Sequence, residues 1–194
     1  MTHIANIADI IQVGIVHPNS SKSNPSYVPI GDPTAIETRS LRKLSNGETI
    51  GDYIPFYLGP RTPMLYVIQH GYNNVKRQHP KDIVYCVISL EDLINDNVYC
   101  LFTDGHALNK ITKTYEGNLL KDIDKFVKYE DVYADFWNDS PDLKRRKEAE
   151  LLLRDDLPVH YIKYYLVYNE DARSKLLSLD VDETKIKVTP KFYF

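Results

Sequence analysis

Short apolar segments separated by polar turns run along most of this chain, a pattern typical of mixed helix and strand structure. The runs of strand length are Ile54–Tyr57, Met64–Gln69, Ile83–Ser89, Val98–Phe102 and Val159–Tyr168. A closing strand is expected where Ile186, Val188, Phe192 and Phe194 alternate with other residues. Pro190 favours the edge of a sheet for it, because proline cannot donate a ladder hydrogen bond. Met1–Ile4 is expected to end a further strand.

Helices are expected where apolar residues recur every three to four positions after a capping residue. Asn6 can cap a helix with the stripe Ile7, Ile10 and Ile11, and Gly14 fits its end. Further helices are expected to begin at Ser89 with Asp92, at Ser140 with Pro141, and at Asn169, the last of them ending near Leu179. Leu119–Val127 has apolar residues at helical spacing. The fold class predicted from these segments is α+β with antiparallel strands.

A polar stretch from His17 to about Asp52 interrupts these elements and is rich in proline. A loop of that length in a compact domain is usually functional or mobile, so we expect one of these two properties for this stretch.

Composition narrows the class of protein. The 194 residues, with 43% hydrophobic and 26% charged, suit one globular domain over residues 1–194. The apolar runs are too short to span a membrane, and no secretion signal opens the chain. Cys86 and Cys100 are too few for a disulfide framework, so a reducing cytoplasm is expected. The formal net charge of −3 excludes a globally basic nucleic-acid binder but leaves a local basic groove possible.

The motifs of several common enzyme classes are missing from the sequence. It contains no phosphate-binding P-loop, no glycine-rich dinucleotide fingerprint, no HExxH and no paired CxxC, so we expect no metal site. The six histidines are scattered, and a Ser-His-Asp triad stays open without a nucleophile elbow to support it.

Four segments carry unusual residues, and each one alone also has a purely structural explanation. They are Thr2-His3-Ile4 with Asn6, Asp52–Tyr66, Phe102–Ala107 and Trp137–Leu153. The last segment is by itself most simply a helix with a solvated basic face, in which Glu148 would point to solvent. Glu150, however, begins an apolar run, so its carboxylate is expected to be partly removed from water. A buried carboxylate of this kind can stabilise positive charge in a reaction.

Taken together, the order and spacing of these segments over nearly the whole chain resemble the DarT family of DNA ADP-ribosyltransferase toxins. That family opens on T-H-I and an Asn, as here at residues 2–6, and continues with D-Y-[IV]-P-F-Y-F-x-P-R-[ST]-P-M-L-Y. Residues 52–66 match this block with Leu58 as the clear departure, and Phe102–Ala107 resemble F-T-D-x-H-A. The R-x-A-E-[FL]-L motif after a Trp is matched by Trp137 and by residues 149–152.

The resemblance implies an ADP-ribosyltransferase fold, with a split, twisted antiparallel β core flanked by helices. It implies transfer of ADP-ribose from NAD, as substrate, to a base of single-stranded DNA, without a metal. It also implies a macrodomain antitoxin that removes the mark. The polar stretch from about Asn19 to Asn46 would then cover NAD. Whether thymidine or guanosine is modified stays open.

The resemblance also assigns site residues. The catalytic residues implied are Glu150, Arg39 and His106, with Arg42 as the alternative to Arg39. Glu150 would orient NAD through a ribose hydroxyl and stabilise the positive charge that develops on the ribose. The NAD contacts implied are Thr2, His3, Asn6 and Arg39. The nucleic-acid contacts implied are Tyr57, Arg61, His106, Lys144 and Arg145. Lys144 and Arg145 belong to a basic run, Lys144–Lys147, that would contact phosphates.

Two other readings compete with DNA modification. One is the same fold acting on RNA or protein, and the other is a non-catalytic nucleic-acid-binding module, against which the intact Glu150 argues. In the DarT family the first strand usually begins several residues before the Thr, and a residue there helps to hold NAD. Only Met1 precedes Thr2 here, so we expect weakened NAD binding.

Overall fold

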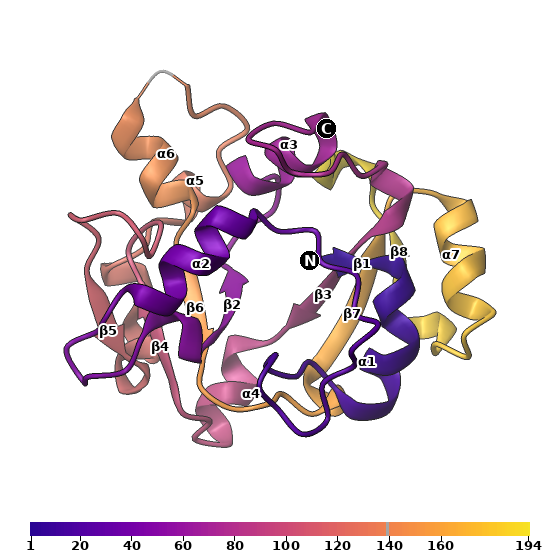
Figure 1. Cartoon of the computed structure of the whole chain (residues 1–194), viewed down its shortest axis with the longest axis horizontal. Helices are drawn as coiled ribbons and strands as arrows, with labels where there is room; N and C mark the ends of the chain where they lie inside the picture. Colours follow the sequence, from indigo (N-terminus) through magenta and orange to yellow (C-terminus); the bar gives the residue numbers. More distant parts are fainter. Residues whose placement is uncertain (139) are drawn as a thin grey trace. The chain divides into compact units, whose positions relative to one another are not determined.

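The computed structural model describes every residue except Asp139 and falls into two compact units (Figure 1). The first unit comprises Met1–Gly31, Val67–Ser89 and Asp156–Phe194, and the second comprises Asp32–Tyr66 and Leu90–Asp155. Each unit contains a four-stranded sheet with helices, so the α+β fold class is confirmed. No helix among the described residues is long and apolar enough to cross a membrane.

The sheet of the first unit has the strand order β1-β3-β7-β8. Its strands are β1 (Thr2–His3), β3 (Ile83–Ile88), β7 (Ile162–Val167) and β8 (Ile186–Val188). The β1–β3 and β3–β7 pairs are antiparallel, whereas β7 and β8 pair in parallel. Helices α1 (Ile7–Val13) and α7 (Glu170–Leu177) share one core with these strands through Ile7, Ile10 and Leu176.

Two of the predicted helix-end residues in the first unit, Gly14 and Asn169, act as expected, whereas Asn6 does not. Gly14 ends α1 at a φ of 86°, and a Cβ there would lie 2.1 Å from the carbonyl oxygen of Leu157. The side chain of Asn169 accepts from the backbone N–H of Ala172 and caps α7. Asn6 occupies the N-cap position of α1 but makes no side-chain cap bond, so that predicted cap is wrong.

The sheet of the second unit has the order β2-β6-β4-β5 and is antiparallel throughout. Its strands are β2 (Ile54–Tyr57), β6 (Glu150–Leu153), β4 (Cys100–Thr103) and β5 (Thr114–Glu116). Figure 1 shows β6 between β2 and β4. All four residues of β6 are buried, which explains why an unbroken apolar run follows Glu150.

The helices of the second unit are α2 (Pro33–Leu41), α4 (Leu90–Asn95), α5 (Tyr129–Val132) and α6 (Pro141–Lys147). Helix α3 (Pro63–His70) contributes residues to both units. The 3-10 helices are η1 (Ile4–Asn6), η2 (Ile50–Asp52), η3 (Pro80–Asp82), η4 (Gly117–Lys125), η5 (Val159–Tyr161), η6 (Glu183–Lys185) and η7 (Pro190–Phe192).

Several predicted elements differ from the structure. Met64–Gln69 is helix, not strand: Pro63 sits at the first helical position, and the hydroxyl of Thr62 accepts from the backbone N–H of Leu65. The polar stretch contains α2, which buries none of its residues and therefore leaves no apolar stripe to detect. The Leu119–Val127 segment is a 3-10 helix broken at Asp122.

The last strand is shorter than expected and has a different direction. The strand β8 ends at Val188, and residues 190–192 form η7. It does lie at the edge of its sheet, as Pro190 indicated, but it runs parallel to β7.

Candidate active site

Glu150 lies at the start of β6 with its carboxylate buried and held on both oxygens. Its Oε1 accepts from the backbone N–H of Ala107 at 2.9 Å, and its Oε2 pairs with Nη1 of Arg39 at 2.9 Å. Its own backbone N–H donates to Oγ1 of Thr103 at 3.0 Å. The residue is 1% exposed, so the carboxylate acts in a low-dielectric setting with a fixed orientation.

Arg39 projects from α2 with 13% of its side chain exposed. Its Nη2 is buried and has no hydrogen-bond partner among the described residues. A buried guanidinium N–H without a partner costs free energy, and an acceptor oxygen of a ligand would relieve that cost. Arg42, the alternative from the sequence, is the C-cap residue of α2, so the ion pair with Glu150 favours Arg39.

Tyr57 and Glu148 lie close to the Glu150 carboxylate. Tyr57 is the cross-strand partner of Glu150, and burial, followed by the charges of Glu150 and Glu148, raises its pKa. Glu148 is only 8% exposed, and burial raises the pKa of its carboxyl to about 7 despite the opposing charge of Lys144.

The prediction that Glu148 points to solvent is therefore wrong. Helix α6 ends at Lys147, and Glu148 is its C-cap with φ −95° and ψ 25°, so it no longer follows the helical face. The sequence signal for this burial is the E-A-E spacing directly before the Leu151-Leu152-Leu153 run.

His106 is half-buried in the turn that follows β4. Its backbone N–H donates to the carbonyl oxygen of Arg145 at 2.8 Å. Burial lowers the pKa of its imidazole, against the opposing effect of Glu150. The ring is therefore neutral at pH 7 and has one nitrogen able to accept a proton.

The basic run of α6 is less exposed than predicted. Lys144 is exposed, but Nζ of Lys147 is fully buried and donates to the carbonyl oxygens of Pro60 and Val132. Burial lowers the pKa of Lys147 to about 8. The side chain of Arg145 is 10% exposed, and its guanidinium pairs with Asp104 and Asp142, so the predicted solvated basic face is wrong.

Arg61 lies in the turn after β2 and adopts a positive φ of 48°. Its Nη1 pairs with Asp135 at 3.0 Å, and 79% of the Asp135 side chain is exposed. An ion pair this exposed contributes little stability.

The predicted NAD contacts near the N-terminus belong to the first unit. Both N–H groups of the Asn6 amide are used, one on Oγ1 of Thr2 and one on the carbonyl of Val28, and its oxygen accepts from the Val28 N–H. Nδ1 of His3 accepts from the backbone N–H of Ala5, and burial lowers the pKa of this imidazole. Asn6 therefore fixes the Val28 segment against η1.

No group of three or more His, Cys, Asp or Glu among the described residues is arranged to hold a metal ion.

Comparisons with known proteins agree over the length of the chain. Residues 1–194 match the model of the DarT family, described as ssDNA thymidine ADP-ribosyltransferase. A DNA ADP-ribosyl transferase of Escherichia coli O127:H6 is 31% identical over 180 residues, covering 91% of this chain and 82% of that protein. A Thermosipho africanus DNA ADP-ribosyl transferase–DNA ADP-ribosyl glycohydrolase fusion protein is 25% identical over 197 residues, covering 100% of this chain and 48% of the fusion.

Solved structures show the same fold. Thermus sp. 2.9 DarT in complex with ADP-ribosylated ssDNA matches with a TM-score of 0.85 and 25% identity, over 100% of this chain and 93% of that one. The same Thermus protein in complex with NAD+ matches with a TM-score of 0.80 and 24% identity, over 100% and 94% of the two chains.

Proposed function

The chain belongs to the DarT family of single-stranded DNA thymidine ADP-ribosyltransferases, and we propose that it transfers ADP-ribose from NAD to a thymidine base. The observation that carries this is the buried Glu150 carboxylate, held between the Ala107 N–H and the Arg39 guanidinium. The Thermus relative bound to ADP-ribosylated ssDNA supports the same substrate class.

Glu150 performs the electrostatic part of the reaction in this proposal. NAD supplies the ADP-ribose group: nicotinamide leaves with the electron pair of the broken bond, a bond from the ribose to the base forms, and the base atom that is modified loses its proton to solvent. A carboxylate fixed beside the ribose stabilises the positive charge that develops there, and it needs no reorganisation because two contacts already hold it.

Arg39 has two roles in the proposal. Its Nη1 orients Glu150, and its unpartnered Nη2 fits an acceptor oxygen of NAD, which carries phosphate and hydroxyl oxygens. In this proposal His106 and Tyr57 contact the acceptor base, and their nearness to Glu150 supports that role.

The remaining binding residues are proposed from the family resemblance. Thr2, His3 and Asn6 contribute to NAD binding, with Asn6 acting by fixing the Val28 segment. Arg61 and Lys144 contact the phosphates of the DNA. We no longer place Arg145 among these, because its guanidinium is committed to two carboxylates.

The cellular setting is proposed on the same basis. The Thermosipho fusion joins a transferase to a glycohydrolase, so we propose a macrodomain glycohydrolase as the antitoxin partner of this chain. We also propose that the chain acts in the cytoplasm, and that residues 1–194, the range matched by the family model, form one catalytic domain.

The test uses NAD labelled in its adenylate part. The purified chain is incubated with single-stranded oligonucleotides with and without thymidine, with the matching duplex, with RNA and with protein. We expect label on thymidine-containing single strands and an ADP-ribosylated thymidine by mass analysis. Label on RNA or protein alone, or binding of DNA without label, would overturn the proposal in favour of the two competing readings.

A further inference from the structure

The turn and loop between β4 and β5 support Glu150 directly. This loop, residues 104–113, carries His106 and Ala107. The N–H of Ala107 supplies one of the two contacts that fix the Glu150 carboxylate. Whatever fixes the loop therefore also fixes the catalytic carboxylate.

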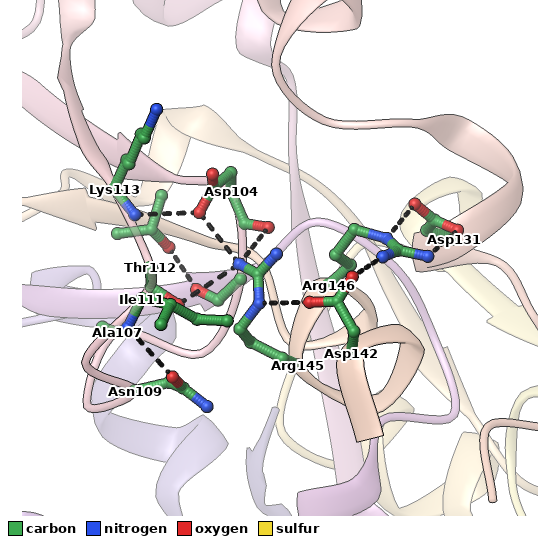
Figure 2. Close-up of polar contacts among 12 residues, drawn as sticks. Asp104, Ala107, Asn109, Ile111, Thr112, Lys113, Asp131, Asp142, Arg145 and Arg146 are labelled. Atoms are coloured by element: carbon green, nitrogen blue, oxygen red, sulfur yellow. Dashed lines mark hydrogen bonds and ion pairs between the residues drawn. The ribbon is translucent and has the colours of Figure 1, made fainter. Parts of the chain in front are cut away.

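Arg145 of α6 contacts this loop at Asp104, His106 and Thr112, and Figure 2 shows its side-chain contacts with Asp104 and Thr112. Its Nη1 donates to the carbonyl oxygen of Asp104 at 3.2 Å and to Oδ1 of Asp104 at 3.0 Å. The same nitrogen lies 3.4 Å from Oγ1 of Thr112, near the far end of the loop. The backbone oxygen of Arg145 accepts from the N–H of His106 at 2.8 Å.

The packing at Gly105 is an independent sign of how closely the loop follows Arg145. A Cβ at Gly105 would lie 2.4 Å from Nη1 of Arg145 and 2.9 Å from its carbonyl oxygen. Only a residue without a side chain fits there. Oγ1 of Thr103 also donates to the carbonyl of Gly105 at 2.7 Å, which ties the turn to the end of β4.

Arg145 is itself held rigidly from the other side. Its Nε donates to Oδ1 of Asp142 at 2.9 Å, while Oδ2 of Asp142 pairs with Arg146. Arg146 in turn donates from Nε to Asp131 of α5 at 2.7 Å. Figure 2 shows the chain of contacts running from Asp131 through Asp142 to Asp104. With two carboxylates on one guanidinium, its charge is neutralised inside the protein.

We propose that Arg145 is a positioning residue for the transfer reaction, which keeps the Ala107 N–H on Glu150 and His106 beside the acceptor base. The inference rests on the proposed function, since it assigns Arg145 a role in the same site. It replaces the expectation that Arg145 contacts DNA phosphate.

The planar guanidinium is essential to this role. Its Nη1 and Nε reach Asp104 and Asp142 at once, and the fixed fork sets the angle between them. A lysine ammonium keeps the positive charge but lacks this geometry. Arg145→Lys therefore separates charge from positioning, and Asp104→Ala removes the side-chain acceptor of the same contact from the loop side.

The experiment measures kcat and the KM for single-stranded DNA at several salt concentrations, below the thermal unfolding midpoint of each variant. We expect Arg145→Lys and Asp104→Ala each to lower kcat by about 10- to 100-fold, as a misplaced catalytic group does. The KM for DNA and its salt dependence should stay close to those of the wild type. The double variant should lose little more than the stronger single variant, because both changes act on the contact between Arg145 and Asp104.

Arg154→Lys is the matched control, since this arginine of the same unit also pairs with a carboxylate, that of Glu48, and lies outside the described contacts of the loop and of Arg145. A loss of kcat in this control as large as in Arg145→Lys would overturn the inference. So would an unchanged kcat in Arg145→Lys, with or without a lower unfolding midpoint. A raised KM with a shallower salt dependence would make Arg145 a phosphate contact instead. Failure of the wild-type chain to label DNA would overturn the proposed function and this inference together, whereas the other outcomes leave the proposed function standing.

Discussion

At the scale of single residues, the site depends on how three buried charges are compensated. Glu150 has an ion pair and a backbone donor, and Lys147 has two carbonyl oxygens. Glu148 is buried beside Glu150 without such a partner for its charge in the described contacts, and its raised pKa favours the neutral form instead. The contacts of Glu150 keep its negative charge at the proposed site. The neutral form of Glu148 avoids a second negative charge next to it.

Replacing Glu150 by Gln should nearly abolish DNA labelling. The amide keeps the size of the side chain but removes the negative charge beside the ribose, and losing one such electrostatic contact costs about 100- to 1,000-fold in rate. The measurement is the rate of label transfer to a thymidine-containing single strand. Glu148→Gln is the matched variant two residues away, and its rate should be closer to the wild type than to Glu150→Gln. Near-normal labelling by Glu150→Gln would contradict the site.

Glu148 should make the stability of the protein depend on pH. Its pKa is about 7 in the folded chain against an ordinary 4.5, so the folded state binds more protons than the unfolded state between these values. The free energy of unfolding therefore falls as pH rises from about 4.5 to 7, by up to about 3 kcal/mol from this group.

Urea unfolding of the wild type and of Glu148→Gln tests this. The Gln variant cannot ionise, so its stability relative to the wild type should grow from pH 5 to pH 7 and then stay level. A difference that does not change with pH would show that Glu148 ionises normally in the folded chain.

At the scale of elements, the position of α2 determines where Arg39 lies. The helix packs so closely on η2 that a Cβ at Gly51 would lie 2.7 Å from Cα of Ser40, next to Arg39. Since none of the residues of α2 is buried, this backbone contact does much to fix the helix.

Gly51→Ala should therefore displace α2 and weaken the Arg39–Glu150 ion pair. We expect a loss of about 1–3 kcal/mol in stability from overpacking, together with slower labelling. Gly47→Ala serves as control, because nothing lies within 4 Å of a Cβ there although its φ of 88° makes the change strained. If both variants slow labelling equally, general strain rather than the place of α2 would explain the effect.

Elements with local signals were predictable from the sequence, and those set by tertiary contacts were not. The strand Ile54–Tyr57 and the caps Ser140 and Asn169 were recognised because alternation and side-chain caps are local. Helix α2 has a local signal too, Asp32 before Pro33, but no apolar stripe to support it.

The basic run on α6 shows the limit at the site. Four consecutive helical residues, Lys144–Lys147, turn through most of a circle, so at least one must face inward. The sequence does not tell which one, since that depends on the carbonyls of Pro60 and Val132. Likewise, only the family resemblance linked Arg39 to Glu150, 111 positions apart by their numbers.

At the scale of the whole molecule, a chain of net charge −3 has to bind a polyanion. The cations near the site are largely compensated: Arg145 and Arg146 pair with carboxylates, and Lys147 is buried. Lys144 is exposed, and the ion pair of Arg61 is partly exposed. Binding should therefore depend more on the fit of a base than on many phosphate contacts.

The final prediction is a shallow salt dependence of DNA binding. One or two phosphate contacts on a single strand give a slope of about −0.7 to −1.4 in log affinity against log salt. Between 50 and 200 mM salt, the dissociation constant for a thymidine-containing strand should thus rise only about 3- to 7-fold. Fluorescence anisotropy with the labelled strand measures this, and Lys144→Ala should reduce the slope by about 0.7. Arg173→Ala, in α7 of the first unit and paired with Glu170 and Glu183, is the control and should leave the slope unchanged. A slope of about −3 or steeper would mean that a larger basic surface than Arg61 and Lys144 carries the DNA.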